Sequence, residues 1–169
     1  MTNTITIPMI AATPENLAPY AKYIGLPTSR TPSVDRHDIT YFHDICDTSD
    51  FTDNPVASFL KAKPHEFKLS NIERHMQTEE AVIPLTGESV MILGPAGEFD
   101  ANKLVAIHLD GTYGIIMNRN TWHFAPFPLN NDNATYMLLS GRHTPKDIEV
   151  LDIEAVLVPE VKNREVAGV

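Results

Sequence analysis

The sequence predicts a mainly β domain, folded as a jelly-roll barrel with one short N-terminal helix. Two observations support this fold class. Beyond residue 39, nine short apolar or alternating runs are separated by turns rich in Pro, Gly, Asn and Asp. Helical spacing of apolar residues is clear in one stretch near the N-terminus. Many short strands with little helix are typical of sandwiches and barrels.

The helix is predicted over residues 14–23. Thr13 is a candidate N-cap, and Pro14 suits the first helical turn. Gly25 and Pro27 signal the end of the helix. The apolar residues that recur at helical spacing are Leu17, Tyr20, Ala21 and Ile24.

The nine runs define the predicted strands. They cover residues 40–45, 57–62, 66–69, 80–85, 90–93, 104–109, 114–117, 135–139 and 148–153. No long repeat or domain boundary interrupts them. We therefore expect a single domain over residues 1–160 and a polar, loosely held tail over residues 161–169.

The chain is acidic, since 22 Asp and Glu against 13 Lys and Arg give a net charge of −9. We expect no nucleic-acid partner, because phosphate binding needs a concentrated basic face. No apolar run is long enough to span a membrane, and the N-terminus lacks the pattern of a signal peptide. These features predict a cytoplasmic protein without a membrane partner. A small anionic substrate remains open.

The lone Cys46 excludes an internal disulfide and a multi-cysteine zinc site. Its acidic neighbours disfavour the thiolate, so we expect a buried, inert thiol. Barrel-type domains of this size often pair through edge strands, which removes exposed edges. A homodimer is therefore expected.

Two carboxylates surround one histidine in the run 72–88. Glu73 and His75 are two residues apart, so both face the same side of a strand. Glu80 follows five residues after His75, and Gly87 lies seven residues after Glu80. This spacing resembles the first motif of the cupins, with Glu73 where their first histidine stands. The expected barrel is accordingly a cupin double-stranded β-helix.

A second histidine, His123, follows the turn formed by residues 118–120. The second cupin motif has a Pro-x-Gly turn there, and the asparagines of this chain also tolerate positive φ. Trp122 is predicted to pack and to fix the loop that carries His123. The predicted metal ligands are His75, Glu80 and His123. Two imidazoles and a carboxylate suit a divalent transition metal, namely Mn, Fe, Ni or Zn.

A second interpretation of the same residues involves no metal. Glu73 and Arg74 would then be solvated charges at a strand end, and His75 a hydrogen-bonded core residue. Spacing alone leaves both interpretations open.

With these motifs the chain resembles the ureidoglycolate lyase family. Glu73-Arg74-His75 is followed by Ile83-Pro84 and Gly87, and a later segment reads Arg119-Asn120-Thr121-Trp122-His123. Further similar segments are Pro19-Tyr20, Phe42-His43-Asp44 and residues 61–64. The chain departs from the family at Asn118 and Phe124, where the family usually has histidine, at Glu80, where it commonly has glutamine, and at residues 140–142.

The resemblance implies a metal-dependent carbon–nitrogen lyase of purine and allantoin catabolism. Such an enzyme splits ureidoglycolate, or a closely related 2-hydroxy acid adduct, into glyoxylate and urea. A general acid must protonate the departing nitrogen, and Glu73 is the first candidate and His43 the second. Arg119 is the candidate for binding the substrate carboxylate. The other candidate substrate contacts are Asn118, Tyr136 and Lys61.

Two alternatives remain at this point. Glu80 and Asn118 also fit another cupin enzyme on a small organic acid, either a dioxygenase or an isomerase or epimerase. The third possibility is a cupin that binds a small molecule without turnover.

Overall fold

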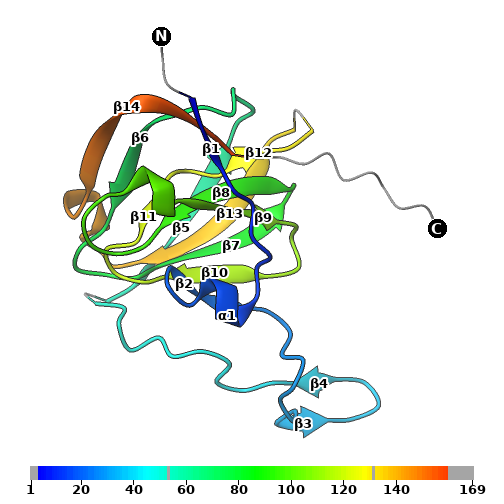
Figure 1. The fold of residues 1–169 in the computed structure, drawn as a ribbon. Coiled ribbons are helices and arrows are strands. Elements are labelled where there is room, and N and C mark those ends of the chain that lie inside the picture. The colour runs from blue at the N-terminus through cyan, green and yellow to red at the C-terminus, as the bar shows by residue number, and fades with distance from the viewer. Residues whose placement is uncertain (1–3, 53, 131, 160–169) are drawn as a thin grey trace.

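The computed structural model describes residues 4–52, 54–130 and 132–159. Two β-sheets lie face to face and form a barrel, while a small hairpin stands off it (Figure 1). The predicted mainly β barrel is confirmed. None of the helices in these residues is both long and apolar enough to cross a membrane. The cytoplasmic location stays a prediction.

One sheet has seven strands in the order β1-β14-β6-β11-β8-β12, and β9 pairs with β8 at the side. The pairing of β1 with β14 is parallel, and the other pairs are antiparallel. The strands are β1 (Thr4–Ile7), β6 (Leu69–Arg74), β8 (Ser89–Gly94), β9 (Val105–Leu109), β11 (Trp122–His123), β12 (Phe127–Pro128) and β14 (Glu149–Pro159).

The facing sheet has five antiparallel strands in the order β2-β10-β7-β13-β5. They are β2 (Ala21–Ile24), β5 (Val56–Ala62), β7 (Glu80–Thr86), β10 (Gly114–Met117) and β13 (Ala134–Ser140). The helix α1 (Pro14–Leu17) lies beside β2, and two short 3-10 turns cover Ala101–Lys103 and Thr144–Lys146.

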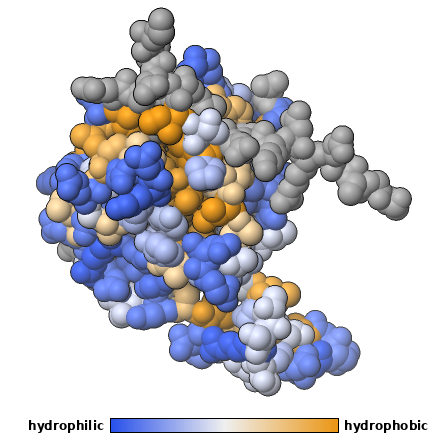
Figure 2. All heavy atoms as spheres, in the orientation of Figure 1, coloured by the Kyte–Doolittle hydropathy of each residue, from blue (hydrophilic) through white to orange (hydrophobic). Residues whose placement is uncertain are grey.

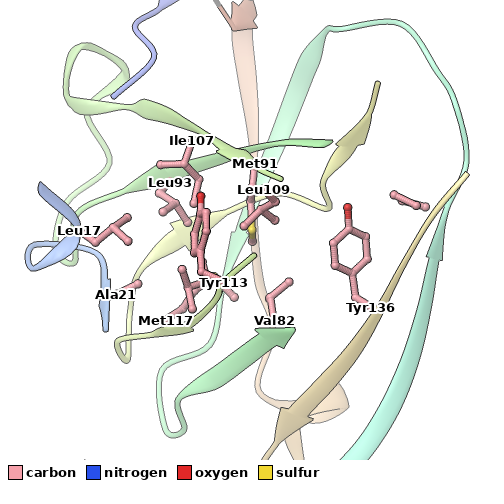
Figure 3. Close-up of a cluster of buried hydrophobic side chains, with 13 residues drawn as sticks. Leu17, Ala21, Val82, Met91, Leu93, Ile107, Leu109, Tyr113, Met117 and Tyr136 are labelled. Atoms are coloured by element: carbon pink, nitrogen blue, oxygen red, sulfur yellow. The ribbon is translucent and has the colours of Figure 1, made fainter. Parts of the chain in front are cut away.

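Apolar side chains form two clusters, one on each side of the seven-stranded sheet. The first lies between the two sheets and takes residues from both (Figure 3). The second covers the outer face of the seven-stranded sheet and includes Trp122, which is buried as predicted. Labelled members of the first cluster are Leu17, Ala21, Val82, Met91, Leu93, Ile107, Leu109, Tyr113, Met117 and Tyr136.

The hairpin of β3 (Val34–Asp35) and β4 (Thr40–Tyr41) belongs to an arm formed by residues 25–52. It projects from the barrel, and Figure 2 shows apolar side chains among its polar ones. The exposed apolar residues of the arm are Leu26, Val34, Ile39, Tyr41 and Ile45.

The predicted helix is too long. Thr13 caps α1 as predicted, because its hydroxyl accepts from the backbone N–H of Asn16. The helix ends at Leu17, however, and Ala21–Ile24 forms β2 against β10. Alternate residues of β2 reach the core, where Tyr23 stacks on Tyr113 with 5.1 Å between ring centroids. Strand pairing in the core therefore outweighs the local helical spacing.

Most predicted strands lie where expected, but two do not. Residues 66–68 precede β6, because Lys68 N–H bonds to Glu66 O in a turn and pairing with β14 begins at Leu69. Only Thr40–Tyr41 of the run 40–45 is a strand. The short strands β1, β2, β3, β11 and β12 were not predicted. The predicted tail, 161–169, lies outside the described residues.

Candidate metal centre

Strand register brings Glu73 and His123 together on the inner face of the barrel. β11 has two residues and lies between β6 and β8. His123 stands opposite Glu73 on one side and opposite the core residue Leu93 on the other. Opposed residues of neighbouring strands face the same side. His75 follows one residue beyond β6 and returns to the same side as Glu73.

Glu80 comes from the facing sheet. It is the first residue of β7 and pairs with Met117, a member of the inner cluster. Its side chain therefore also points inward, and its Oε2 lies 2.9 Å from Nε2 of His75. The site thus joins both sheets at one end of the barrel.

Three of these side chains form a compact set of possible metal ligands. One ligand atom each from Glu73, His75 and His123 lies within 4.8 Å of the other two. Oε1 of Glu73 is 3.8 Å from Nε2 of His123, and the two imidazole centroids are 5.1 Å apart. Ligands about 2.1 Å from a shared metal stand up to about 4 Å apart, so a small contraction brings this set into range.

Backbone carbonyls fix both imidazoles in the orientation that a metal requires. Nδ1 of His75 donates to Asp147 O at 2.7 Å, and Nδ1 of His123 donates to Thr121 O at 2.9 Å. A carbonyl only accepts, so both Nδ1 atoms carry hydrogen and both Nε2 atoms face the interior. Metal-binding histidines are held in this way in known sites. The donor set therefore fits a divalent transition metal.

The two histidines differ in their protonation. Burial alone would lower the pKa of His75, but the bonds to Glu80 and to the Asp147 carbonyl raise the pKa of His75 above its usual value. Burial lowers the pKa of His123, and this effect exceeds the opposing influence of the nearby carboxylates. The surroundings therefore favour the charged form of His75 and the neutral form of His123.

Solvent reaches the cluster from the Glu73 side. The side chains of His75 and His123 are each 6% exposed and that of Glu80 is 12% exposed, whereas Glu73 is 37% exposed. Glu73 is therefore the most accessible of the four side chains.

Glu73 and Glu80 both lie beside the two histidines, in different relations to them. Glu73, predicted as the general acid, joins the two histidines in the compact set. Glu80, predicted as a ligand, is hydrogen-bonded to His75. The reason is register, because Glu73 lies directly opposite His123 while Glu80 approaches from the facing sheet. Their chemical roles stay predictions.

Three other predicted residues lie away from the cluster. His43 belongs to the projecting arm, where its Nδ1 contacts the hydroxyl of Tyr41. Lys61 is exposed on β5, and alternation along the strand places it on the outer face of its sheet. Tyr136 is fully buried, and its hydroxyl donates to Ser89. The structure does not bring these side chains to the cluster.

Arg119 and Asn118 border the site but contact other parts of the chain. Arg119 Nη2 donates to Asp50 O at 3.0 Å and lies 3.3 Å from the Asp50 carboxylate. Asn118 Nδ2 donates to Ala18 O. The guanidinium that was predicted to bind substrate therefore holds the arm against the loop before β11.

Sequence reasoning missed Asp147 and Glu79. Asp147 supplies a carbonyl to His75 and a carboxylate to Gln77 N–H, yet it stands alone in a loop and carries no motif. Glu79 is buried, and its Oε1 lies 2.7 Å from Nζ of Lys22. Its position directly before Glu80 was the one available signal.

The thiol of Cys46 is partly buried. Burial raises the pKa of its thiol, and the nearby Glu79, Asp44 and Asp47 carboxylates raise it further while Lys22 opposes them. The predicted buried thiol is thus only partly buried, and its lack of reactivity stays a prediction.

Comparison with known proteins assigns the family. A sequence model described as ureidoglycolate lyase matches residues 4–160. The chain belongs to the ureidoglycolate lyase family. This finding confirms the family resemblance that its motifs indicated.

Curated relatives in the family are 24–30% identical to this chain over the aligned residues. A ureidoglycolate lyase of Pseudomonas fluorescens is 30% identical over 70% of this chain and 74% of its own length. Ureidoglycolate lyase 2 of Rhizobium meliloti is 24% identical over 81% and 87%. One from Burkholderia mallei is 26% identical over 63% of this chain, and the match spans 65% of that relative, just under two thirds.

A solved structure shares the fold. The crystal structure of a dTDP sugar isomerase from Desulfovibrio desulfuricans superimposes with a TM-score of 0.51, covering 76% of this chain and 82% of the isomerase. Sequence identity is 14%, so the likeness concerns the architecture alone.

Proposed function

We propose that this protein is a metal-dependent lyase that cleaves ureidoglycolate to glyoxylate and urea. The observation that supports this most is the inward-facing set of Glu73, His75 and His123 in a member of the ureidoglycolate lyase family. The identity of the metal, among Ni, Mn, Zn and Fe, is a matter for metal analysis.

Glu73, His75 and His123 would hold the metal, each through one side-chain atom. A bound divalent ion would supply Lewis-acid polarisation of the substrate's hydroxyl and carboxylate oxygens. The chain contributes the orientation, because the Thr121 and Asp147 carbonyls keep the two Nε2 atoms aimed at one point.

Glu80 would move the proton of the reaction. Cleavage breaks the bond between the hydroxyl-bearing carbon and the ureido nitrogen, and the hydroxyl becomes the aldehyde of glyoxylate. The hydroxyl loses one proton and the departing nitrogen gains one, so a single carboxylate can carry it from one atom to the other. Glu80 faces the three other side chains from the opposite sheet, at hydrogen-bond distance from His75.

The test follows glyoxylate release from ureidoglycolate by the purified protein, before and after chelation and with each metal restored. We expect chelation to abolish release and one or more metals to restore it. Absence of release with every metal removes the ureidoglycolate assignment. Oxygen consumption with a panel of small organic acids, or a ligand-dependent rise in melting temperature without product, would then identify one of the alternatives.

We also propose that the protein is a cytoplasmic homodimer paired through β5. This strand ends the order of the five-stranded sheet, and its Phe59 is exposed directly opposite the exposed Met137. Unpaired edges with apolar side chains favour association. Sedimentation should show a dimer, which Phe59→Glu converts to a monomer and Leu26→Glu in the arm does not. A monomeric unmodified protein would contradict this proposal.

A further inference from the structure

The strands that carry Glu73, His75 and His123 also carry two side chains that point to the opposite side of the sheet. Arg74 lies between Glu73 and His75, and Trp122 directly precedes His123. Because side chains alternate along a strand, Arg74 and Trp122 meet on the outer face. The carbon at the centre of the Arg74 guanidinium lies 4.3 Å from the centre of the indole ring.

Arg74 and Trp122 are also joined through one backbone carbonyl. Arg74 Nη1 donates to Gly97 O at 2.8 Å, and Trp122 Nε1 donates to the same oxygen at 3.1 Å. Glu149 on β14 accepts from Arg74 Nε at 2.9 Å. The Arg74 guanidinium thus stacks on Trp122 of β11 while it hydrogen-bonds to Gly97 O and to Glu149 of β14.

Packed neighbours hold the indole ring of Trp122 in place. Trp122 is almost fully buried, and Phe99 packs edge-on against it with 5.7 Å between ring centroids. Gly94 stands opposite Trp122 on β8, and a Cβ there would lie 3.1 Å from the Cβ of Trp122 and 2.8 Å from Leu104. The absence of a side chain at Gly94 therefore lets the ring approach closely.

The pairing between β6 and β11 is short. β11 is two residues long, and its ladder with β6 has a single register pair, Glu73 with His123. On its other side β11 pairs with β8 through Trp122–Gly94 and His123–Leu93, so the pairing with β6 fixes the separation of Glu73 and His123 at one point only. Binding sites need positional accuracy of about 0.5 Å, which packed neighbours of the ligand residues usually provide.

We propose that Arg74 is a positioning residue, which grips Trp122 from outside the sheet and thereby fixes the separation of the Glu73, His75 and His123 ligand atoms inside it. This inference rests on the proposed metal site. Cation–π contacts are strongest when desolvated, and the Arg74 side chain is only 16% exposed.

The experiment measures Co²⁺ affinity and the visible spectrum of the Co²⁺-loaded protein, together with the melting temperature of the metal-free protein. Arg74→Met keeps much of the side-chain volume but removes the charge and the hydrogen bonds. Arg74→Lys retains the charge without the planar fork that serves the ring, Gly97 O and Glu149 together. It also gives a second variant should Arg74→Met fail to fold.

Two controls separate positioning from stability. Glu149→Gln removes the exposed ion pair and leaves the stack intact. Phe67→Leu weakens the same outer apolar cluster away from the contact between Arg74 and Trp122, because Phe67 stacks on Phe127.

We expect Arg74→Met to weaken Co²⁺ binding by about 10-fold or more and to alter the spectrum, with partial recovery in Arg74→Lys. Both controls should keep the Co²⁺ affinity and spectrum of the unmodified protein, even where Phe67→Leu lowers the melting temperature as much as Arg74→Met does. Unchanged affinity and spectrum in Arg74→Met overturn this inference alone. Absence of Co²⁺ binding in the unmodified protein overturns the metal proposal as well.

Discussion

The cluster end of the barrel and the arm hold their side chains in different ways. At the cluster, Glu73, His75 and His123 are placed by neighbouring strands, and both histidine Nδ1 atoms bond to carbonyls. The arm is held by a few polar anchors. These are Lys22 Nζ to Asp47 O, Arg119 to Asp50, and Thr52 Oγ1 to Gln77 O.

The difference shows which contacts can be inferred from spacing. Alternation and pairing apply to residues on strands, so the motif residues of β6, β7 and β11 meet as expected. The arm follows no such period, and its His43 lies on the hairpin side of the molecule. The following changes test this contrast between strand-placed and anchor-held groups.

The largest effect is expected from the two carboxylates of the cluster. Glu80→Gln should retain the metal and lose about 10²–10⁴-fold in turnover, because the amide cannot carry a proton. Glu73→Gln should lose the metal itself. Metal content by elemental analysis and kcat together decide the matter. The reverse pattern would make Glu80 the ligand and Glu73 the acid, as the sequence predicted.

Lys22→Met removes one anchor of the arm and the ion pair with Glu79. It leaves the Glu79 carboxylate buried without its cation, so the free energy of unfolding should fall by about 3 kcal/mol. The double variant Lys22→Met with Glu79→Leu should recover most of that loss. Urea unfolding of both variants provides the measurement, and an equal loss in the double variant would show that the pair itself stabilises the fold.

Tyr136→Phe should lower stability by about 1–2 kcal/mol and leave KM unchanged. The buried hydroxyl of Ser89 loses its partner, while the phenyl ring still fills the core. Chemical unfolding and steady-state kinetics separate the two effects. A raised KM with unchanged stability would instead support the predicted substrate contact.

The protonation of His75 predicts how the metal-free protein responds to pH. Its pKa is raised on folding, so its stabilising contribution is complete below the unfolded value of about 6.5 and is lost as pH rises through the folded value. The stability difference between the unmodified protein and His75→Gln should therefore shrink as pH rises. The pKa of His123 is shifted in the opposite direction, but His123 is present in both the unmodified protein and His75→Gln.

Metal affinity should rise over the same pH range, since the metal displaces the proton of His75. Titration of Co²⁺ at several pH values measures this rise. A pH-independent affinity would show that His75 is not a ligand.

The smallest effect is expected for Arg119→Gln. Its ion pair with Asp50 is partly exposed, and such pairs contribute less than about 1 kcal/mol. The melting temperature should hardly change, and KM should stay the same because the guanidinium is bound to the arm. A tenfold rise in KM would show that Arg119 leaves Asp50 to bind the substrate.

Much of the fold could be predicted because it follows local period and turn chemistry. The bounds of β7, β8, β10 and β13 lie within about one residue of their expected ranges. The short strands could not be found, since two residues such as Trp122–His123 carry no period. β2 was mistaken for helix because tertiary pairing decides between two patterns that the sequence allows.

The site was predictable to a similar degree. The four motif residues are adjacent because strand alternation fixes which side they face. That Glu73 lies opposite His123 depends on register between strands, which spacing within one strand does not contain. Asp147 lies 72 residues from His75 and could be found only in three dimensions.

The carbonyl of Asp147 has a consequence for biosynthesis. A nascent chain that has emerged only as far as residue 140 has both histidines and most of the two sheets, yet His75 still lacks the acceptor that orients its ring. The binding geometry is therefore completed late in translation. Until then, the His75 ring lacks the hydrogen bond that aims its Nε2 at the other two candidate ligands.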